Sequence, residues 1–254
     1  MEDFVYNSPY AFSENSPIAF VELEGLEKVL AIYYHGGPTG GGQPTTVGDA
    51  GYTGQYYQNT QTFAQNNNME FRGTIIAPGF TSASGVETGV NFVNENYCEG
   101  DQVIVYGYSY GVDVAVDLSE SLNELGINVD LLVTVDGSDG PLQNATVNTD
   151  IPENVNTNLN VYQTDDSGSS SSSRSTGATS SGTSSGSSGS SSSNSGSSNS
   201  PGSNGGPNTA VNPNRTSVVN RNVTGQGVNH GNIQQKAEKT INYYIENFIR
   251  TFQN

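Results

Sequence analysis

Short apolar runs recur along the chain and are separated by segments in which apolar residues return every three or four positions. The runs that predict strands cover residues 29–34, 73–78, 102–106, 129–135, 159–162 and 217–219. The run at 102–106 is apolar throughout, which is typical of a central strand in a parallel sheet.

Helices are predicted between these strands. The first covers about residues 55–66, and the second carries Val86, Val90, Val93 and Tyr97 on one face. The third carries Ala115, Leu118, Leu122 and Leu125 and ends at Gly126, while the last carries Ile233, Ala237, Ile241, Tyr244, Ile245 and Phe248. Strands that alternate with helices in this way predict an α/β fold, with a mostly parallel sheet covered by helices on both faces.

One long segment departs from this pattern. Residues 167–207 are nearly all Ser, Gly, Asn and Thr, a composition that buries too little apolar surface to offset the entropy of ordering the chain. We therefore expect a disordered linker inserted between the fifth and sixth predicted strands. The linker explains why only 32% of the 254 residues are hydrophobic, since the rest of 28–254 has the composition of an ordinary globular domain. Residues 1–27 show no clear period and form a separate N-terminal segment.

The charge is strongly acidic and uneven. The formal net charge is −17, and residues 1–166 hold 23 of the 25 acidic residues but only Lys28 and Arg72 as bases. Such a field repels phosphate backbones and anionic lipid, so we expect no nucleic-acid partner. No apolar stretch approaches the length of a membrane span, and the first residues lack the basic and apolar regions of a signal peptide. We therefore expect no stable membrane insertion.

The sequence predicts neither a metal nor a cofactor. Cys98 is the single cysteine, and two histidines without a cysteine pair do not make a zinc site. The glycines at 40–42 lack the Lys-Ser/Thr of a phosphate-binding loop, so nucleotide binding is unsupported.

The most specific chemical signal is Gly107-Tyr108-Ser109-Tyr110-Gly111, which lies between a predicted strand and a predicted helix. In a nucleophile elbow, a serine occupies the tight turn from strand to helix, and the flanking glycines let the two elements approach closely. The pattern also matches residues 182–186, but there it lies within the Ser/Gly-rich tract. The context therefore singles out Ser109 as a candidate nucleophile.

A serine nucleophile needs a base, and the chain offers His35 and His230. His230 follows Ser109 and stands just before the last helix, so it is the candidate base. His35 ends the first strand in His35-Gly36-Gly37-Pro38. Two interpretations stay open: the histidine-glycine pair shapes an oxyanion loop, or Gly36, Gly37 and Pro38 simply build a turn. We expect the backbone N–H groups of Gly37 and Tyr110 to form the oxyanion hole.

Two positions compete for the acid. Asp136 ends the strand that follows the elbow helix, whereas Asp165 ends the next strand, which is the commoner position in this kind of fold. We favour Asp136, because an apolar strand and a Gly-rich turn place its carboxylate at the carboxyl edge of the sheet. Asp165 opens directly into the Ser/Gly-rich tract, which would hold an acid poorly, but its spacing does not exclude it.

With Ser109, an aspartate and His230 in that order, residues 28–252 resemble a compact serine α/β-hydrolase of the lipase, esterase or thioesterase kind. The resemblance implies an α/β-hydrolase-like sheet and hydrolysis of a small-molecule or lipid ester or of a thioester. Val112 departs from the pattern, since many lipases have a second glycine there, so the packing of the helix beneath the elbow is expected to differ.

A second resemblance lies in Ser8-Pro9-Tyr10-Ala11-Phe12-Ser13-Glu14-Asn15 and Val21-Glu22-Leu23-Glu24-Gly25-Leu26-Glu27. These residues are similar to the end of the RHS/YD-repeat-associated core of bacterial polymorphic toxins, which precedes a variable effector module. The usual Asp-Pro-x-Gly-Leu cleavage element is replaced by Glu22-Leu23-Glu24-Gly25-Leu26. The resemblance implies a bacterial effector, located in the cytoplasm and exported as part of an RHS-type protein, with a cognate immunity protein as partner.

Two functions therefore compete. The first is a serine hydrolase in which Ser109 attacks, His230 transfers the proton and Asp136 orients the imidazole. The second is a non-catalytic interaction or scaffold module built on a hydrolase fold, because a fold alone does not fix function. The sequence does not give the substrate.

Overall fold

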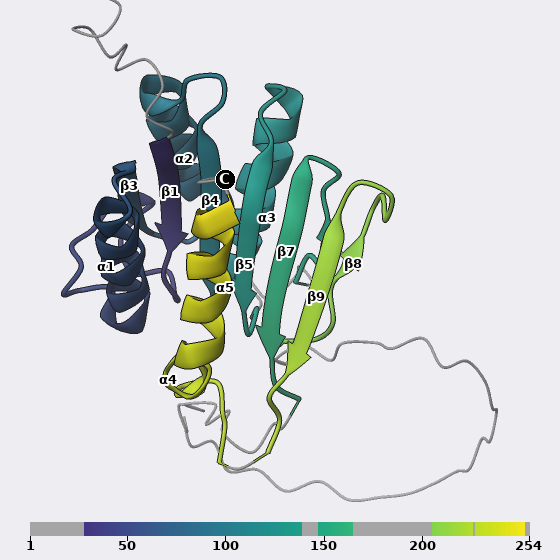
Figure 1. Ribbon diagram of the computed structural model, residues 1–254. Helices are drawn as coiled ribbons and strands as arrows, with labels where there is room; N and C mark the ends of the chain where they lie inside the picture. The colour runs from purple at the N-terminus through teal and green to yellow at the C-terminus, as the bar shows by residue number, and fades with distance from the viewer. Residues whose placement is uncertain (1–27, 139–146, 165–204, 226, 252–254) are drawn as a thin grey trace, which may run out of the picture.

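A computed structural model describes residues 28–138, 147–164, 205–225 and 227–251 (Figure 1). Its centre is a seven-stranded sheet with the strand order β2-β3-β1-β4-β5-β7-β9. The strands are β1 (Lys28–Tyr34), β2 (Gln43–Pro44), β3 (Glu70–Ala77), β4 (Gln102–Tyr108), β5 (Val129–Val135), β7 (Val155–Tyr162) and β9 (Ser217–Asn222). All neighbouring strands are parallel except β2, which runs antiparallel to β3 at one edge. The mostly parallel sheet brings the carboxyl ends of β1, β4, β5 and β7 to one edge.

Helices cover both faces of this sheet, as the alternation of strands and helices predicts. One face is covered by α1 (Gly51–Asn66), α4 (Ile233–Lys236) and α5 (Glu238–Thr251), the other by α2 (Ser82–Asn96) and α3 (Gly111–Glu124) (Figure 1). Successive side chains of a strand point to opposite faces. Tyr33 accordingly packs in the core beneath α1, and Tyr34 in the core beneath α2 and α3.

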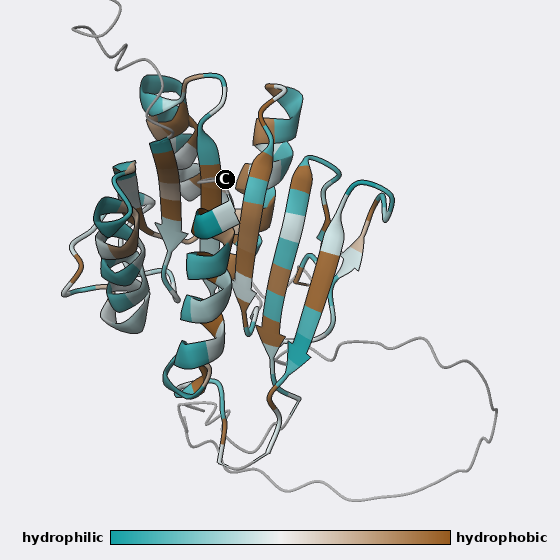
Figure 2. Cartoon of the chain, in the orientation of Figure 1, coloured by the Kyte–Doolittle hydropathy of each residue, from teal (hydrophilic) through white to brown (hydrophobic). Residues whose placement is uncertain are grey.

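The sheet is covered differently beside β7, where apolar and polar residues alternate (Figure 2). Asn158 and Asn160 are buried, and their amide groups donate to Thr134 Oγ1 at 3.3 Å and to the Gly206 carbonyl oxygen at 2.7 Å. Asn208 completes this network, because its amide donates to Thr134 Oγ1 and to Asn158 Oδ1, both at 3.0 Å. Residues 206–208, rather than a helix, therefore lie against β5 and β7 at this place, and side-chain amide hydrogen bonds hold them there.

The structure confirms the six predicted strands and their order along the chain, and it adds three strands that the sequence pattern does not reveal. These are β2, β6 (Asp150–Ile151) and β8 (Thr209–Ala210), each only two residues long. A two-residue strand shows no periodicity, so no pattern signals it. The predicted last helix consists of α4 and α5, separated at Ala237.

The predicted divisions of the chain are only partly within the structure. Residues 1–27 and most of the Ser/Gly-rich tract lie outside the described residues, so the N-terminal segment and the linker stay predictions. Gly205 and Gly206, the last glycines of the predicted tract, lie within the described residues. The Gly205 N–H donates to the Gly137 carbonyl oxygen at 2.7 Å.

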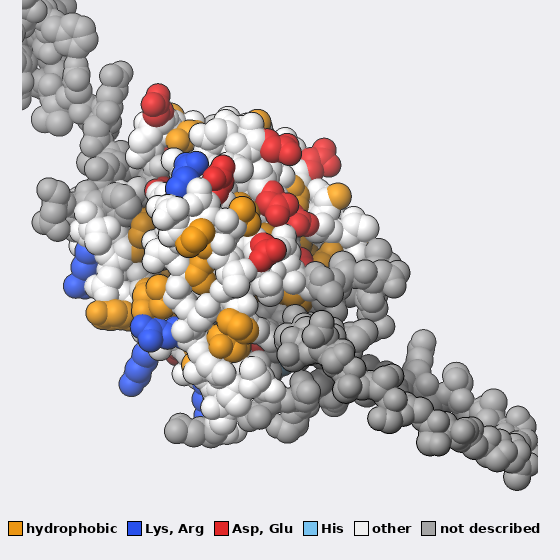
Figure 3. All heavy atoms as spheres, turned by 90° about the vertical axis from the view of Figure 1, so that its right-hand side faces the viewer, with side chains coloured by type: hydrophobic (Ala, Val, Ile, Leu, Met, Phe, Trp, Pro, Cys, Tyr) orange, Lys and Arg blue, Asp and Glu red, His pale blue; other side chains and the backbone are white. Residues whose placement is uncertain are grey.

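Within the described ranges, no helix is both long and apolar enough to cross a membrane. The surface seen from the β9 edge carries separate acidic and basic side chains among many uncharged ones (Figure 3). One pair of opposite charge, Arg215 and Glu153, lies 3.8 Å apart and is exposed, so its contribution to stability is small.

Candidate active site

Ser109 occupies the turn between β4 and α3, as the motif predicts. Its φ angle is 56°, in the left-handed region that non-glycine residues rarely adopt and that functional sites often use. A Cβ on Gly107 would lie 2.4 Å from the Gly111 carbonyl oxygen, and one on Gly111 would lie 2.6 Å from the Tyr34 carbonyl oxygen. Both glycines are therefore required by close backbone approach, which confirms the physical interpretation of the motif.

The turn presents Tyr110 at the beginning of α3. The Ser109 N–H donates to the Val135 carbonyl oxygen at 3.0 Å, and the Val112 N–H donates to the Ser109 carbonyl oxygen at 3.0 Å. Tyr110 is the N-cap residue of α3, and the first N–H groups of a helix have no partner within the helix. These groups, together with the positive end of the helix dipole, favour an anion near Ser109.

The loop after β1 lies against the elbow. A Cβ on Gly36 would lie 3.0 Å from both Ser109 Cβ and Tyr108 Cδ1, so a larger residue at position 36 would press on the elbow. Gly37 follows with a φ of 78°, a conformation that favours glycine. The structure thus brings the His35-Gly36-Gly37 loop beside Ser109, with Gly36, which the sequence analysis did not single out, in direct contact.

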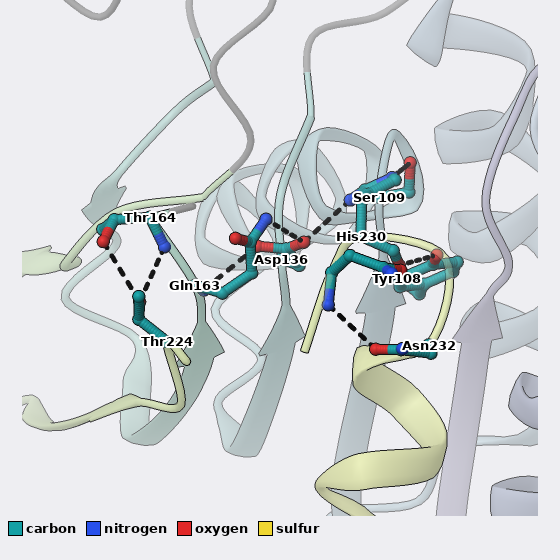
Figure 4. A network of polar contacts seen from close by, with 9 residues as sticks. Tyr108, Ser109, Asp136, Gln163, Thr164, Thr224, His230 and Asn232 are labelled. Carbon is teal, nitrogen blue, oxygen red and sulfur yellow. Dashed lines mark hydrogen bonds and ion pairs between the residues drawn. The ribbon is translucent and has the colours of Figure 1, made fainter. Parts of the chain in front are cut away.

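Ser109, His230 and Asp136 form a continuous chain of hydrogen bonds (Figure 4). Ser109 Oγ lies 2.8 Å from His230 Nε2, and His230 Nδ1 lies 2.8 Å from Asp136 Oδ2. A carboxylate only accepts hydrogen bonds, so Nδ1 carries a proton, and in the neutral imidazole Nε2 is then left to accept from the serine hydroxyl. This tautomer is the one that a base acting on Ser109 requires.

Asp136 is fully buried and is bound by more than the histidine. Its Oδ1 accepts from the Gln163 backbone N–H at 3.3 Å, and its Oδ2 accepts from Gln163 Nε2, also at 3.3 Å. Its φ of 47° turns the chain away from β5, and its N–H donates to the Val161 carbonyl oxygen at 2.8 Å. The end of β7, the predicted position of the alternative acid, therefore contributes Gln163 instead, and Gln163 holds the carboxylate of Asp136.

Gly205 completes the wall behind Asp136. A Cβ on Gly205 would lie 2.5 Å from Asp136 Oδ1, and the φ of Gly205 is 67°. Val112, the residue that departs from the lipase pattern, packs against the turn at Gly137. A Cβ on Gly137 would lie only 3.1 Å from Val112 Cγ1, so the glycine leaves room for the valine. Val112 is buried there, so the larger residue is accommodated by the turn after Asp136.

His230 is held by groups on two sides. The Tyr108 hydroxyl donates to the His230 carbonyl oxygen at 2.6 Å, and the Tyr108 ring stacks on the imidazole with a centroid distance of 5.3 Å. The loop itself is closed by Asn232, whose side chain accepts from the Asn229 N–H at 2.9 Å and donates to the Gly227 carbonyl oxygen at 2.9 Å. The imidazole is therefore oriented by its neighbours as well as by Asp136.

Burial shifts the pKa of several groups around the site, among them Tyr108 and His35. Removal from water, reinforced by the nearby charge of Asp136, raises the pKa of Tyr108 to about 12, so its hydroxyl remains a donor at neutral pH. Burial lowers the pKa of His35, which favours the neutral imidazole.

The structure therefore brings together Ser109, Asp136 and His230, while Asp165, the alternative acid, lies outside the described residues. Sequence reasoning missed Tyr108 as a partner of His230, and it missed Gln163 and Gly205. The position of Tyr108 beside Ser109 was visible in the motif, but no sequence signal pairs position 108 with position 230. Among the residues that the structure describes, no group of three or more His, Cys, Asp or Glu side chains is placed to hold a metal ion.

No protein-family model matches the chain, and no curated protein matches it. The solved structures that are similar to it in fold include the following three. The NocB thioesterase domain from the nocardicin cluster is 12% identical with a TM-score of 0.42, covering 90% of this chain and 94% of its own. ClbQ from the colibactin NRPS/PKS pathway is 8% identical with a TM-score of 0.45, covering 89% and 98%. A hyperthermophilic esterase from the archaeon Pyrobaculum calidifontis is 11% identical with a TM-score of 0.39, covering 89% and 78%.

The assignment to a fold class rests on the chain's own architecture. A mostly parallel sheet with helices on both faces carries Ser109 at a strand-to-helix elbow, and Asp136 and His230 follow in chain order. These features define an α/β-hydrolase-like fold.

Proposed function

We propose that the chain is a serine hydrolase that cleaves carboxylic esters or thioesters. The observation that carries the proposal is the pair of 2.8 Å contacts that link Ser109 Oγ through His230 to Asp136. A structural serine at a tight turn would need neither a histidine within hydrogen-bond distance nor a buried carboxylate behind that histidine.

The reaction proceeds through two acyl transfers. Ser109 Oγ attacks the carbonyl carbon while its proton passes to His230 Nε2, and the carbonyl oxygen becomes an oxyanion. When the tetrahedral intermediate collapses, the bond to the leaving alcohol or thiol breaks and His230 returns the proton to it. Water then attacks the acyl carbon while its proton passes to His230 Nε2. The bond between the acyl carbon and Ser109 Oγ breaks, His230 returns the proton to Oγ, and the carboxylic acid leaves.

Each surrounding group has one part in this reaction. Asp136 fixes the Nδ1–H tautomer of His230 and stabilises the imidazolium that forms. Tyr110 and Gly37 are proposed to donate backbone N–H groups to the oxyanion. Tyr108 and Gln163 act through other residues and are positioning residues, the first on His230 and the second on Asp136.

The decisive experiment is labelling with a fluorophosphonate, which reacts covalently with an activated serine. The wild-type chain should gain the mass of the probe on Ser109, and Ser109→Ala should gain none. The same pair should differ in turnover of 4-nitrophenyl acetate, with Ser109→Ala reduced to the uncatalysed background. The rival function, a non-catalytic module, predicts a folded wild-type chain that neither takes the label at Ser109 nor turns over any ester.

The biological setting is a further part of the proposal. The resemblance of residues 8–27 to the end of an RHS-associated core supports a bacterial effector that acts on an ester, with an immunity protein as its partner. Expression of the wild-type chain in a bacterium, beside Ser109→Ala, tests this setting. An effector should slow growth in the wild-type form alone, whereas equal growth of both strains in every compartment tested would contradict it.

A further inference from the structure

A cavity of about 490 Å³ lies beside the candidate nucleophile, between the carboxyl ends of β1 and β3 and the beginning of α1. The residues of its wall that matter here are His35, Gly36, Thr39, Gln43, Asp49 and Ala77. Gly36 also contacts the elbow, since a Cβ at that position would lie 3.0 Å from Ser109 Cβ. The cavity therefore adjoins the elbow through Gly36, while Ser109 itself is not part of its wall.

The wall of the cavity carries several polar side chains beside its apolar surface. Its polar groups are hydroxyl, amide, imidazole and carboxylate groups, which come from Thr39, Thr45, Gln43, His35 and Asp49. The wholly apolar side chains of the wall are Ala77 and Pro44, and Leu, Ile, Val, Met and Phe are missing from it. A long alkyl chain gains free energy only by removing apolar surface from water, about 25 cal/mol per Å². This wall has no large apolar side chain for such a chain to pack against.

The cavity also carries a negative charge. Asp49 Oδ2 accepts from the Thr46 hydroxyl at 2.6 Å, and the Asp49 side chain is exposed. Lysine and arginine are absent from the wall, so no cation there neutralises Asp49.

His35 adds no charge to the cavity. Its Nδ1 lies 2.8 Å from the Gly36 carbonyl oxygen, which only accepts, so Nδ1 carries a proton. Its Nε2 lies 3.3 Å from Thr39 Oγ1 and accepts from that hydroxyl in the neutral ring. Burial lowers the pKa of His35, which also favours the neutral ring. The imidazole is therefore neutral at pH 7, and the cavity has one formal charge.

From this lining we propose that the cavity binds a primary ammonium group of a small ester, with Asp49 as its counter-ion, and that the substrate is a short cationic ester rather than a lipid. The inference rests on the proposed function. An ammonium group has three N–H donors, and the wall supplies the oxygen acceptors that they need at Asp49, Thr39 and Gln43. The acidic N-terminal two thirds of the chain would also raise the local concentration of such a substrate.

Matched esters test the proposal, because a methyl group in place of an ammonium group preserves the shape. Ethyl 4-aminobutanoate is compared with ethyl pentanoate for a charge on the acyl side, and 3-aminopropyl acetate with butyl acetate for a charge on the alcohol side. The ratio of kcat/KM values within each pair, corrected for the uncatalysed rates, is measured at pH 7 by titration of released acid.

The wild-type chain should favour the ammonium member of at least one pair. Asp49→Asn should lower that ratio by about two- to fivefold, the range for an ion pair with an exposed carboxylate. The preference should also shrink as salt is raised from about 0.02 to 0.5 M. Asparagine preserves an oxygen that can accept from Thr46, and thermal unfolding checks that this variant folds. Glu87→Gln is the matched control, because Glu87 is an exposed carboxylate on α2 outside this cavity, and it should leave the ratio unchanged.

The outcomes separate the two proposals. A wild-type chain that takes the fluorophosphonate at Ser109 and hydrolyses the neutral esters equally well or better overturns the cavity proposal and leaves the hydrolase proposal standing. A ratio that Glu87→Gln lowers as much as Asp49→Asn also overturns it, since the effect is then one of overall charge. A chain that neither takes the label nor hydrolyses any of the four esters overturns both.

Discussion

Replacing Asp136 by asparagine tests the site most sharply, because the structure dictates how the new amide must lie. Asp136 Oδ1 faces the Gln163 backbone N–H, a donor that cannot rotate away. The asparagine oxygen must therefore take this place, and its NH₂ group must take the place of Oδ2. There it faces Nδ1 of His230 in place of the present acceptor.

The consequence is the wrong tautomer. An NH₂ group only donates, so the imidazole accepts through Nδ1 and carries its proton on Nε2, where it can no longer deprotonate Ser109. Gln163 assists the change, since its Oε1 is buried without a partner among the described groups and can accept from the new amide after the Gln163 side chain rotates. Removing the acid in this way in other triads costs about 10⁴ in kcat. We expect a loss of about 10³–10⁴-fold, equivalent to about 4–5.5 kcal/mol of transition-state stabilisation.

The assay is kcat for 4-nitrophenyl acetate, with active sites counted by the fluorophosphonate and folding checked by thermal unfolding. Asp165→Asn is the control and should cost less than about threefold. A large loss in Asp165→Asn with little loss in Asp136→Asn would transfer the acid to position 165. If neither change matters while Ser109→Ala abolishes activity, Ser109 and His230 act as a dyad and the orientation argument is refuted.

Three further predictions concern the groups around the site. Tyr108→Phe retains the stacked ring but loses the 2.6 Å hydrogen bond to the His230 carbonyl oxygen, so kcat should fall by about three- to tenfold with KM little changed; an unchanged kcat would contradict its positioning role. Gly205→Ala should lower the free energy of unfolding by at least about 1 kcal/mol and reduce kcat, because its Cβ would lie 2.5 Å from Asp136 Oδ1 at a positive φ. Gly206→Ala is the control and should be neutral, since no heavy atom lies within 4 Å of a Cβ at that position. Equal effects of the two changes in urea unfolding would refute the contact argument. The pKa of Tyr108 is about 12 in the folded chain and 10 in the unfolded chain, so it contributes stability that is complete below pH 10 and is lost as the pH rises through 12. Urea unfolding between pH 9 and 12 should therefore show a smaller loss of unfolding free energy with pH in Tyr108→Phe than in the wild-type chain. Identical slopes of unfolding free energy against pH would contradict this.

Much of the fold was predictable because the strands are buried on both faces. A strand such as β4 or β5 must then be apolar at nearly every position, and that run is visible in the sequence. The segments that were missed are stabilised by polar or backbone contacts instead. Asn208, for example, looks like a turn residue in the sequence, yet its buried amide bonds Thr134 and Asn158, which lie 74 and 50 positions away.

The sequence by itself determined the elements that local rules specify. The glycines of the motif 107–111 predicted the elbow, because only glycine tolerates so close an approach of strand and helix. The apolar runs predicted the parallel sheet, and the chain order favoured His230 over His35 as the candidate base. Only the tertiary structure decided how these parts meet. The three groups come from positions 109, 136 and 230, and two distances of 2.8 Å depend on how β4, β5 and the loop before α4 are placed by packing. The contacts of Tyr108 with His230 and of Gln163 with Asp136 were also decided only by the tertiary structure. Hydrogen bonds between residues 122 and 27 positions apart leave no periodic pattern in the sequence, and they form only once the sheet has aligned its strand ends.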